Sequence, residues 1–377
     1  MSKVKNSDFF TLNVTDAVQA IYKKDITAAE LANSCINRYK VIEPKVHAWV
    51  YFSEDMILQQ AENIDKNFSK KKSILTLAGI PVGIKDIFNS SNMPTCMGSS
   101  IWEDFMPGND ARVVTNLRRE GANIFGKTVT AEFAVHEPGP TLNPYNTKHI
   151  AGTSSTGSAV AVATGMVPAA IGSQTAGSTI RPASYSGVYG YKPSFGCIPR
   201  TGALKTLDTL DHVTCFTRSV CDLPLMFDAM RVKGMNYPYI FDNFDLNKEK
   251  EKSTWKIAFV KTSVWSNIEA YAKEKIDLWI KTLAKINIKV SFVELPKEFD
   301  QSHDVHHAIY NKALSYYFRE EYDSSPNRVS NIMKSMIEEG KKINLNYYKE
   351  CLDKQNQLSA QLESFLSDYD IVISPST

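Results

Sequence analysis

Three short segments of the chain carry residue types that could do chemistry. Lys85 lies inside an apolar stretch, Ser154 lies in a run of small and hydroxyl-bearing residues, and Ser178 lies in a second such run. A serine hydroxyl is a poor nucleophile until an adjacent base takes its proton. Burial in an apolar setting lowers the pKa of a lysine, so a lysine in a buried strand can act as that base. The residue types therefore indicate nucleophilic catalysis by a serine that a lysine activates.

Histidine is not obviously available as the base, because only His136 and His149 lie near these segments in the sequence. Alternation along a strand places Lys85 on the same face as Gly83 and Ile87, with Ile84 and Asp86 on the opposite face. We expect the missing side chain of Gly83 to leave room for Ser154 to approach the Lys85 amine.

The three segments resemble the signature of the amidase signature family, which includes malonamidases, fatty-acid amide hydrolases and the A subunit of the tRNA-dependent amidotransferases. The matching text is Gly79-Ile-Pro-Val-Gly-Ile-Lys85-Asp86, Gly152-Thr-Ser154-Ser155-Thr-Gly-Ser158 and Gly172-Ser-Gln-Thr175-Ala-Gly177-Ser178-Thr-Ile-Arg181. Each segment alone is more typical of a surface lysine, a loop or a turn. Their order and separation carry the resemblance, and similar text runs from about residue 15 to 377.

The resemblance implies a role for each matched residue. Ser178 would be the nucleophile, Ser154 the bridging serine and Lys85 the base. The separation of the two serines, 178 − 154 = 24, is the family spacing. Asp86 and Arg181 would be structural residues near the site.

The resemblance also implies how the reaction would proceed. Ser178 would attack an amide carbonyl, and backbone N–H groups of the loop from Thr175 would hold the oxyanion, where Gly177 permits close approach. Ala176 and Ser155 complete the expected oxyanion and substrate-binding set. The reaction needs neither a metal ion nor an organic cofactor.

The sequence departs from the family pattern at several glycines. Thr153, Thr156 and Ala176 each replace a common glycine, and Arg181 follows the nucleophile by three residues where many relatives place it two after. The variants at 176 and 181 point away from the tRNA amidotransferase pattern. Family members have a cis peptide bond before the bridging serine, and the β-branched Thr153 leaves open whether the bond before Ser154 is cis.

Helical and strand patterns alternate around these segments, which predicts an α/β fold with a central mixed β-sheet covered on both faces by α-helices. The expected helices are near residue 15 and over 27–39, 54–68, 113–120, 159–163, 268–285 and most of 303–369. The expected strands are over 77–87, 122–126, 167–171, 256–261, 289–295 and 370–374. We expect one domain over 1–377, with an N-terminal helical part at 1–70, a catalytic core at 71–220 and a βαβ-like peripheral part at 245–300.

A P-loop pattern for nucleotide phosphates is matched letter by letter from Gly121 to Thr128. A true P-loop follows a strand and opens a helix, so that backbone N–H groups converge on phosphate. Here a helical pattern precedes Gly121, and the interior of the motif is apolar. We therefore expect a buried strand that ends in a turn, not an ATP or GTP site.

The region after residue 300 offers two further clusters. His303, His306 and His307 have a helical spacing that can bind metal, but no partner segment rich in Cys or carboxylates is evident, so we expect no metal site. A run of aromatic residues follows: Tyr310, Tyr316, Tyr317 and Phe318. This run indicates core packing, with the wall of an acyl pocket as the alternative.

Composition narrows the class of protein. Lys and Arg number 43 against 41 Asp and Glu, and a net charge of +2 gives no reason to expect a nucleic acid or an anionic membrane as partner. No apolar stretch is long enough to span a bilayer, and no secretory signal is visible. Six scattered cysteines without CxxC spacing are typical of a cytoplasmic protein with reduced thiols.

These observations predict an amidohydrolase that acts on a small carboxamide. Two alternatives stay open: the A subunit of a glutamine-dependent amidotransferase, and a non-catalytic family member. Family sequences continue beyond the strand at 370–374, so we expect a domain that is incomplete at its C-terminal end. Whether a second chain completes it, or the protein is a homo-oligomer, is left open.

Overall fold

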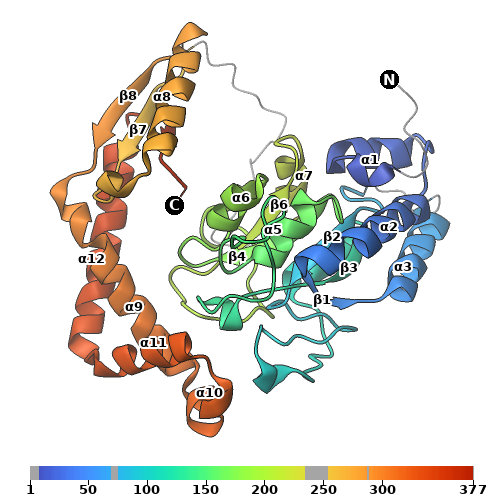
Figure 1. The fold of residues 1–377 in the computed structure, drawn as a ribbon, viewed down its shortest axis with the longest axis horizontal. Helices are drawn as coiled ribbons and strands as arrows, with labels where there is room; N and C mark the ends of the chain where they lie inside the picture. Colours follow the sequence, from blue (N-terminus) through green and yellow to red (C-terminus); the bar gives the residue numbers. More distant parts are fainter. Residues whose placement is uncertain (1–7, 69–74, 234–253, 287, 377) are drawn as a thin grey trace. The chain divides into compact units, whose positions relative to one another are not determined.

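The computed structural model describes residues 8–68, 75–233, 254–286 and 288–376 (Figure 1). The chain divides into two compact units. The first holds residues 1–244 with 317–335, and the second holds residues 245–316 with 336–376. The predicted parts 1–70 and 71–220 lie in the first unit, and the predicted part 245–300 lies in the second.

A six-stranded sheet organises the first unit, with strand order β1-β3-β2-β4-β6-β5. The strands are β1 Trp49–Phe52, β2 Pro81–Lys85, β3 Asn123–Thr128, β4 Ala169–Gln174, β5 Tyr189–Tyr191 and β6 His212–Thr217. Strand β2 runs parallel to β3 and β4, whereas β1 and β6 pair antiparallel with β3 and β4. The sheet is therefore mixed, as the sequence predicted.

Helices cover this sheet. They are α1 Val14–Tyr22, α2 Ala28–Val46, α3 Glu54–Phe68, α4 Arg112–Arg119, α5 Thr156–Ala163, α6 Ile180–Ser186 and α7 Asp222–Met230. Every residue of β2 and β3 is buried, so both faces of these central strands are covered. The predicted α/β fold with a doubly covered mixed sheet is confirmed.

The start of α2 shows why local sequence was informative. Thr27 Oγ1 accepts a hydrogen bond from the Glu30 backbone N–H at 3.1 Å, and Glu30 Oε2 accepts one from the Thr27 N–H at 2.8 Å. This is the predicted capping box. The helix runs on to Val46 rather than ending at Tyr39, and the Val46 side chain is buried.

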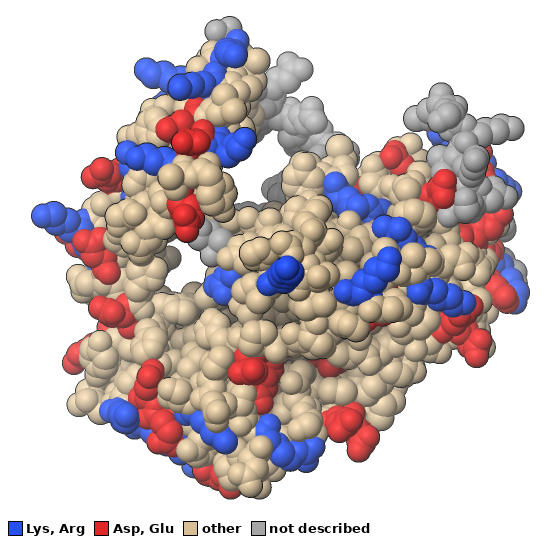
Figure 2. Space-filling model, in the orientation of Figure 1, with Lys and Arg blue, Asp and Glu red and all other residues tan. Residues whose placement is uncertain are grey.

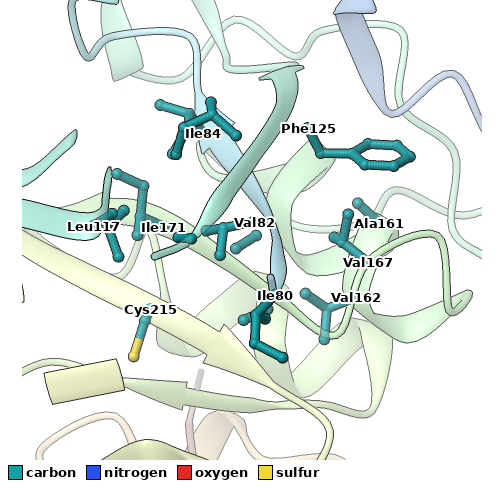
Figure 3. Packing of buried hydrophobic residues seen from close by; sticks show 14 of the residues in the cluster. Ile80, Val82, Ile84, Leu117, Phe125, Ala161, Val162, Val167, Ile171 and Cys215 are labelled. Carbon is teal, nitrogen blue, oxygen red and sulfur yellow. The ribbon is translucent and has the colours of Figure 1, made fainter. Parts of the chain in front are cut away.

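The apolar core gathers around β2, as Figure 3 shows for Val82, Ile84 and Ile171. All three side chains are fully buried. Because alternate residues of a strand point to opposite faces, Lys85 projects away from the face that Ile84 occupies. The central strand thus places an amine on the other side of the sheet from this apolar cluster.

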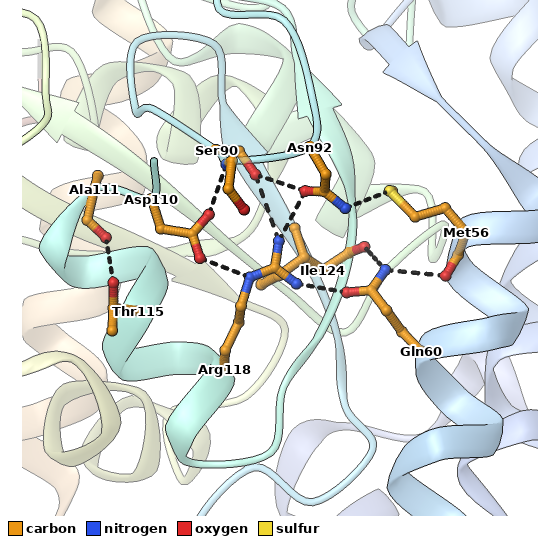
Figure 4. Close-up of polar contacts among 10 residues, drawn as sticks. Met56, Gln60, Ser90, Asn92, Asp110, Ala111, Thr115, Arg118 and Ile124 are labelled. Carbon is orange, nitrogen blue, oxygen red and sulfur yellow. Dashed lines mark hydrogen bonds and ion pairs between the residues drawn. The ribbon is translucent and has the colours of Figure 1, made fainter. Parts of the chain in front are cut away.

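Arg118 of α4 ties together three parts of the first unit (Figure 4). Its guanidinium donates to Asp110 Oδ2 at 2.9 Å, to Gln60 Oε1 at 2.7 Å and to Asn92 Oδ1 at 3.1 Å. Gln60 lies on α3, and the other two acceptors lie in the loops that follow β2. The network therefore fixes the chain that leaves Lys85.

Replacing Arg118 with alanine is expected to lower the free energy of unfolding by about 2 kcal/mol, because two partly buried acceptors, Asp110 and Gln60, lose a charged donor. The neighbouring Arg119 is exposed and supplies the control. Arg119→Ala should change stability by no more than about 0.5 kcal/mol. Urea denaturation measures both, and equal effects of the two variants would contradict the prediction.

The segment with the P-loop letters forms strand β3, which follows helix α4 directly. Its lysine, Lys127, is fully buried and forms an ion pair with Asp86 at 2.7 Å. The predicted buried strand is confirmed.

The second unit holds a three-stranded sheet of order β8-β7-β9, with all pairs parallel. The strands are β7 Ile257–Lys261, β8 Val290–Glu294 and β9 Ile371–Ile373. Helix α8, Ala270–Lys285, connects β7 to β8 and makes the predicted βαβ arrangement. The helices that follow along the chain are α9 Ser302–Tyr317, α10 Arg319–Ser324, α11 Asn331–Lys342 and α12 Leu345–Leu366. Helix α10 and the first five residues of α11 lie in the first unit.

Candidate active site

Lys85 is the last residue of β2 and its side chain is completely buried. Its Nζ donates to Ser154 Oγ at 2.7 Å and to Ser173 Oγ at 2.8 Å. Burial lowers the pKa of Lys85 to about 7, and the negative charge of Asp211 opposes this effect. A large fraction of the amine is therefore neutral near pH 7, as a lysine base requires.

Ser154 stands in the turn before α5, and the peptide bond that precedes it, Thr153–Ser154, is cis. Backbone contacts hold this turn. The Ser154 carbonyl accepts from the Ala131 N–H at 3.1 Å, and the Gly157 N–H donates to the Val129 carbonyl at 3.2 Å. A Cβ at Gly157 would lie 2.3 Å from the Ala48 carbonyl oxygen, so only glycine allows this approach.

Ser178 lies in the loop between β4 and α6 and is partly exposed. Its carbonyl accepts from the Ser155 N–H at 3.3 Å, which holds residues 175–178, the predicted nucleophile loop, against the turn that carries Ser154. The hydrogen bonds among the described residues include none between the Ser154 and Ser178 hydroxyls. The first contact of the predicted relay is thus formed and the second is open, a common state for a catalytic pair without substrate.

The backbone N–H groups of residues 175–178 point to no acceptor within the described parts of the chain. The next two N–H groups, those of Thr179 and Ile180, both donate to the side-chain oxygen of Gln174, at 3.0 and 3.1 Å. Gln174, which no sequence motif singled out as a site residue, therefore shapes the loop. The unsatisfied N–H groups are the kind of donors that receive an oxyanion.

Ser155 does not have the environment of a substrate-binding residue. It is fully buried, its hydroxyl donates to the Ser173 carbonyl at 3.1 Å, and that hydroxyl also accepts from the Ser173 N–H at 3.3 Å. Because its own N–H is spent on the Ser178 carbonyl, Ser155 joins β4 to the turn instead of contacting a ligand.

The space beside Gly83 is also used differently from the sequence prediction. A Cβ there would meet Thr128 and Trp49 at 3.1 Å and Ala170 at 3.3 Å. The missing side chain makes room for these neighbours and not for Ser154. The expectation that Gly83 admits Ser154 was wrong, because neighbouring strands fill that face.

Arg181 links the nucleophile loop to the cis turn. Its Nη1 donates to Thr153 Oγ1 at 2.8 Å, and a Cβ at Gly177 would lie 2.8 Å from its Nη2. The close approach that Gly177 permits is therefore an approach by Arg181. Thr153, which replaces a family glycine, supplies the acceptor for this arginine.

A cavity of about 260 Å³ lies beside these residues, and Ser173 and Thr175 form part of its wall. Its apolar lining comprises Ile87, Phe88, Ala134, Ala203, Leu204 and Val213. Neither Ser154 nor Ser178 lines the cavity, which instead reaches the partner of Lys85 and the first residue of the nucleophile loop. The sequence offered no sign of Ser173 beyond its place in the third motif.

The charged groups of the cavity wall balance one another. Arg200 and Lys205 face Asp208 and Asp211, and Lys205 pairs with Asp208 at 2.9 Å. Burial lowers the pKa of His212, which is therefore neutral near pH 7. The wall thus carries no excess charge that would select an ionic ligand.

Three other features bear on the kind of site that the chain could hold. No group of three or more His, Cys, Asp or Glu side chains that could hold a metal ion occurs in the described ranges. Within those ranges, no helix is both long and apolar enough for a membrane span. Basic and acidic side chains are interspersed over the face in Figure 2, so this face has no extended patch of one sign.

In this mixed α/β fold a buried lysine contacts a serine in a turn, and a loop that carries another serine lies beside that turn. This arrangement defines the class of proteins with a serine–lysine site. Within this class, the chain belongs to the amidase family, because the family model described as Amidase matches residues 30–377.

Curated relatives share this family. The chain is 32% identical over 300 residues to the A subunit of the glutamyl-tRNA(Gln) amidotransferase of Gloeothece citriformis, and the match covers 76% of this chain and 61% of that one. The corresponding protein of Acidothermus cellulolyticus is 35% identical over 230 residues, 59% of this chain and 46% of that one. The chain thus spans about three fifths of the length of the first of these relatives. These relatives match the alternative of an amidotransferase A subunit that the sequence left open, although the motif variants at Ala176 and Arg181 point away from that pattern.

Solved structures share the fold. A structure described as a vestigial protein complex that reveals the origins of an s-triazine catabolic enzyme superposes with a TM-score of 0.85 at 24% identity, over 97% of this chain and 81% of that one. Peptide amidase from Stenotrophomonas maltophilia superposes with a TM-score of 0.82 at 22% identity, over 98% and 85%. The prediction of an incomplete C-terminal end gains no support from these likenesses.

Proposed function

We propose that the chain is an amidohydrolase that cleaves the C–N bond of a small carboxamide through an acyl-enzyme on Ser178. The observation that carries the proposal is the buried Lys85 amine, whose lowered pKa and 2.7 Å contact with Ser154 Oγ suit a base. Membership of the amidase family supports the same activity.

The proposed reaction begins with proton transfer. Neutral Lys85 takes the proton of the Ser154 hydroxyl, and Ser154 takes the proton of Ser178. The Ser178 oxygen bonds to the amide carbonyl carbon, and the N–H groups of residues 175–178 stabilise the resulting oxyanion. Ser173 accepts a hydrogen bond from the amine, which directs the nitrogen lone pair toward Ser154.

The second half reverses this path. Ser154 delivers a proton to the leaving nitrogen as the C–N bond breaks, and the amine departs. Lys85 returns its proton to Ser154 and is neutral again. Water then attacks the acyl carbon as its proton passes through Ser154 to Lys85. That proton returns through Ser154 to the Ser178 oxygen as the bond between Ser178 and the acyl carbon breaks. The chain's own residues supply every proton transfer in this scheme.

The cavity supports a small and uncharged substrate. Its volume of about 260 Å³ lies just below the range of ordinary ligand pockets, roughly 300–1,000 Å³. Its cations and carboxylates cancel, so a neutral carboxamide fits better than a strongly charged one. We further propose a cytosolic location, which the scattered spacing of the six cysteines supports.

A fluorophosphonate probe tests the proposal, because it reacts with activated serines. We expect one adduct on Ser178, found by peptide mass spectrometry, and no adduct in Lys85→Ala. Circular dichroism of the variant shows whether its fold is intact. A folded wild-type protein without an adduct on Ser178 would overturn the proposed activity of this chain and favour a non-catalytic role.

The rate of labelling should depend on pH in a defined direction. Only the neutral form of Lys85 can accept a proton, and its pKa is about 7. The labelling rate is therefore expected to rise with pH through a midpoint near pH 7 and to level off above about pH 8. Second-order rate constants between about pH 5 and 9 measure this, and a rate that is flat over this range would contradict a lysine base.

A second candidate is the A subunit of a glutamine-dependent amidotransferase, which the 32% identity to a protein of that description favours. This role would require a partner chain and a route for ammonia. Ammonia release from simple carboxamides such as benzamide, by the chain alone and without tRNA, supports the amidohydrolase. Release from glutamine only when a partner is present supports the amidotransferase.

A further inference from the structure

Asp211 lies beside the start of the nucleophile loop, where the neighbouring strands β4 and β6 meet. Strands β4 and β6 are antiparallel, and Gln174 at the end of β4 pairs with His212 at the start of β6. The next position beyond this pair brings Thr175 opposite Asp211, although 36 residues separate them in sequence. The pairing of the strands therefore places a carboxylate directly at the start of the loop.

The Asp211 carboxylate accepts four hydrogen bonds. Oδ1 accepts from the hydroxyls of Thr175 and Thr206, both at 2.7 Å. Oδ2 accepts from the backbone N–H groups of Thr206 at 2.8 Å and Leu207 at 2.9 Å. Two carboxylate oxygens offer about four lone-pair positions, so none is left for a ligand. Asp211 thus connects two parts of the protein and does not bind substrate.

We propose that Asp211 is a positioning residue that ties the loop of residues 175–178 to Thr206 and Leu207, of which Thr206 lines the cavity. This inference rests on the proposed function, because the loop N–H groups matter as oxyanion donors. Such donors accelerate a reaction only when they are held in place beforehand. Within the described chain these N–H groups have no acceptor of their own, so the side-chain bond of Thr175 helps to hold the loop.

Asp211 also acts on the proposed base. Its charge raises the pKa of Lys85 against the effect of burial. The other polar groups around Lys85 are paired or uncharged. Asp86, the next residue in the chain, is neutralised by Lys127 of β3. The contact from β4 is the uncharged Ser173, and His212 of β6 is neutral near pH 7. Removing the Asp211 charge should therefore lower the pKa of Lys85 further.

The experiment compares two isosteric variants by the rate of fluorophosphonate labelling of Ser178 across pH. Asp211→Asn removes the charge and presents an amide N–H to groups that are themselves donors. Thr175→Val removes the bond between the loop and Asp211, together with the 3.1 Å contact between the Thr175 and Thr206 hydroxyls, and leaves the Asp211 charge in place. It keeps the test decisive if Asp211→Asn does not fold. Asp65→Asn is the control, because Asp65 accepts two backbone N–H groups of α2, from Ala28 and Ala29, far from the loop in sequence.

Both test variants are expected to label about 10- to 100-fold more slowly than wild type, since one misplaced oxyanion donor costs at least that much. The midpoint of the pH dependence should move to lower pH in Asp211→Asn and stay unchanged in Thr175→Val. Asp65→Asn should label at the wild-type rate.

Two results would overturn the inference. If Thr175→Val labels within about twofold of the wild-type rate, the bond between Thr175 and Asp211 does not position the loop, whatever the result for Asp211→Asn. If folded Asp211→Asn keeps the wild-type midpoint of the pH dependence, the Asp211 charge does not raise the pKa of Lys85. A wild-type protein that does not label at all marks failure of the proposed function itself, which these variants do not measure.

Discussion

Replacing Lys85 with methionine is expected to slow the labelling of Ser178 by about a thousandfold, because the variant has no base for the Ser154 proton. Methionine keeps the length and apolar stem of the side chain. Fluorophosphonate labelling followed by mass spectrometry measures the loss. Lys66→Met, which removes an exposed lysine paired with Glu62, should label at the wild-type rate.

The same substitution is expected to preserve or raise thermal stability. The pKa of Lys85 is 10.5 in its ordinary state and about 7 in the folded protein, so folding releases a proton between these two pH values. The buried amine therefore costs stability, most at and below pH 7 and not at all above pH 10.5. A variant that melts well below wild type at pH 7 would mean that Lys85 supports the fold, and the slow labelling would then need another cause.

Removing the carboxylate of Asp86 is expected to lower the free energy of unfolding by about 3–5 kcal/mol. Asp86 and Lys127 are 1% and 0% exposed, and their ion pair measures 2.7 Å. Burial raises the pKa of Asp86 and lowers that of Lys127, so each charge depends on the other. Asp86→Ala leaves the Lys127 amine with only Pro94 and Thr95 as partners.

Urea denaturation of Asp86→Ala measures this loss. The double variant Asp86→Leu with Lys127→Met is the matched control, because it removes both charges and fills the space with apolar groups. It should recover most of the lost stability. If the single variant loses less than about 1 kcal/mol, the ion pair is not needed by the fold.

Much of the fold was predictable because the sequence patterns that mark its helices and strands are local. The helix at 54–68 has the predicted bounds, and the strands at β3, β7 and β8 differ from the predictions by one or two residues. Apolar periodicity and capping act within one turn or one strand, so neighbouring residues carry the information. The sequence motifs also led to the contact between Lys85 and Ser154 that the structure shows.

The errors at the site share a different physical origin. Ser155 was assigned by its place in a motif and Gly83 by alternation along a strand, but neither shows which neighbours fill the space beside a residue. Strand pairing decides this: Thr128 of β3 and Ala170 of β4 occupy the space beside Gly83.

The omissions have the same cause. Ser173 contacts Lys85 across 88 residues, and Asp211 contacts Thr175 across 36. Both contacts arise from neighbouring strands whose pairing no local pattern predicts. A polar residue at the end of a buried strand is the only trace that either leaves in the sequence.

The glycine at position 157 has a consequence for how this protein can change over time. It lets the start of α5 rest on the main chain of Ala48 and Val129, and the carbonyl of Ser154 is held by a main-chain N–H as well. Main-chain atoms are the same in every residue type. Side chains can therefore be exchanged at positions 48 and 129 over generations while the main-chain contacts that hold the turn of Ser154 stay the same.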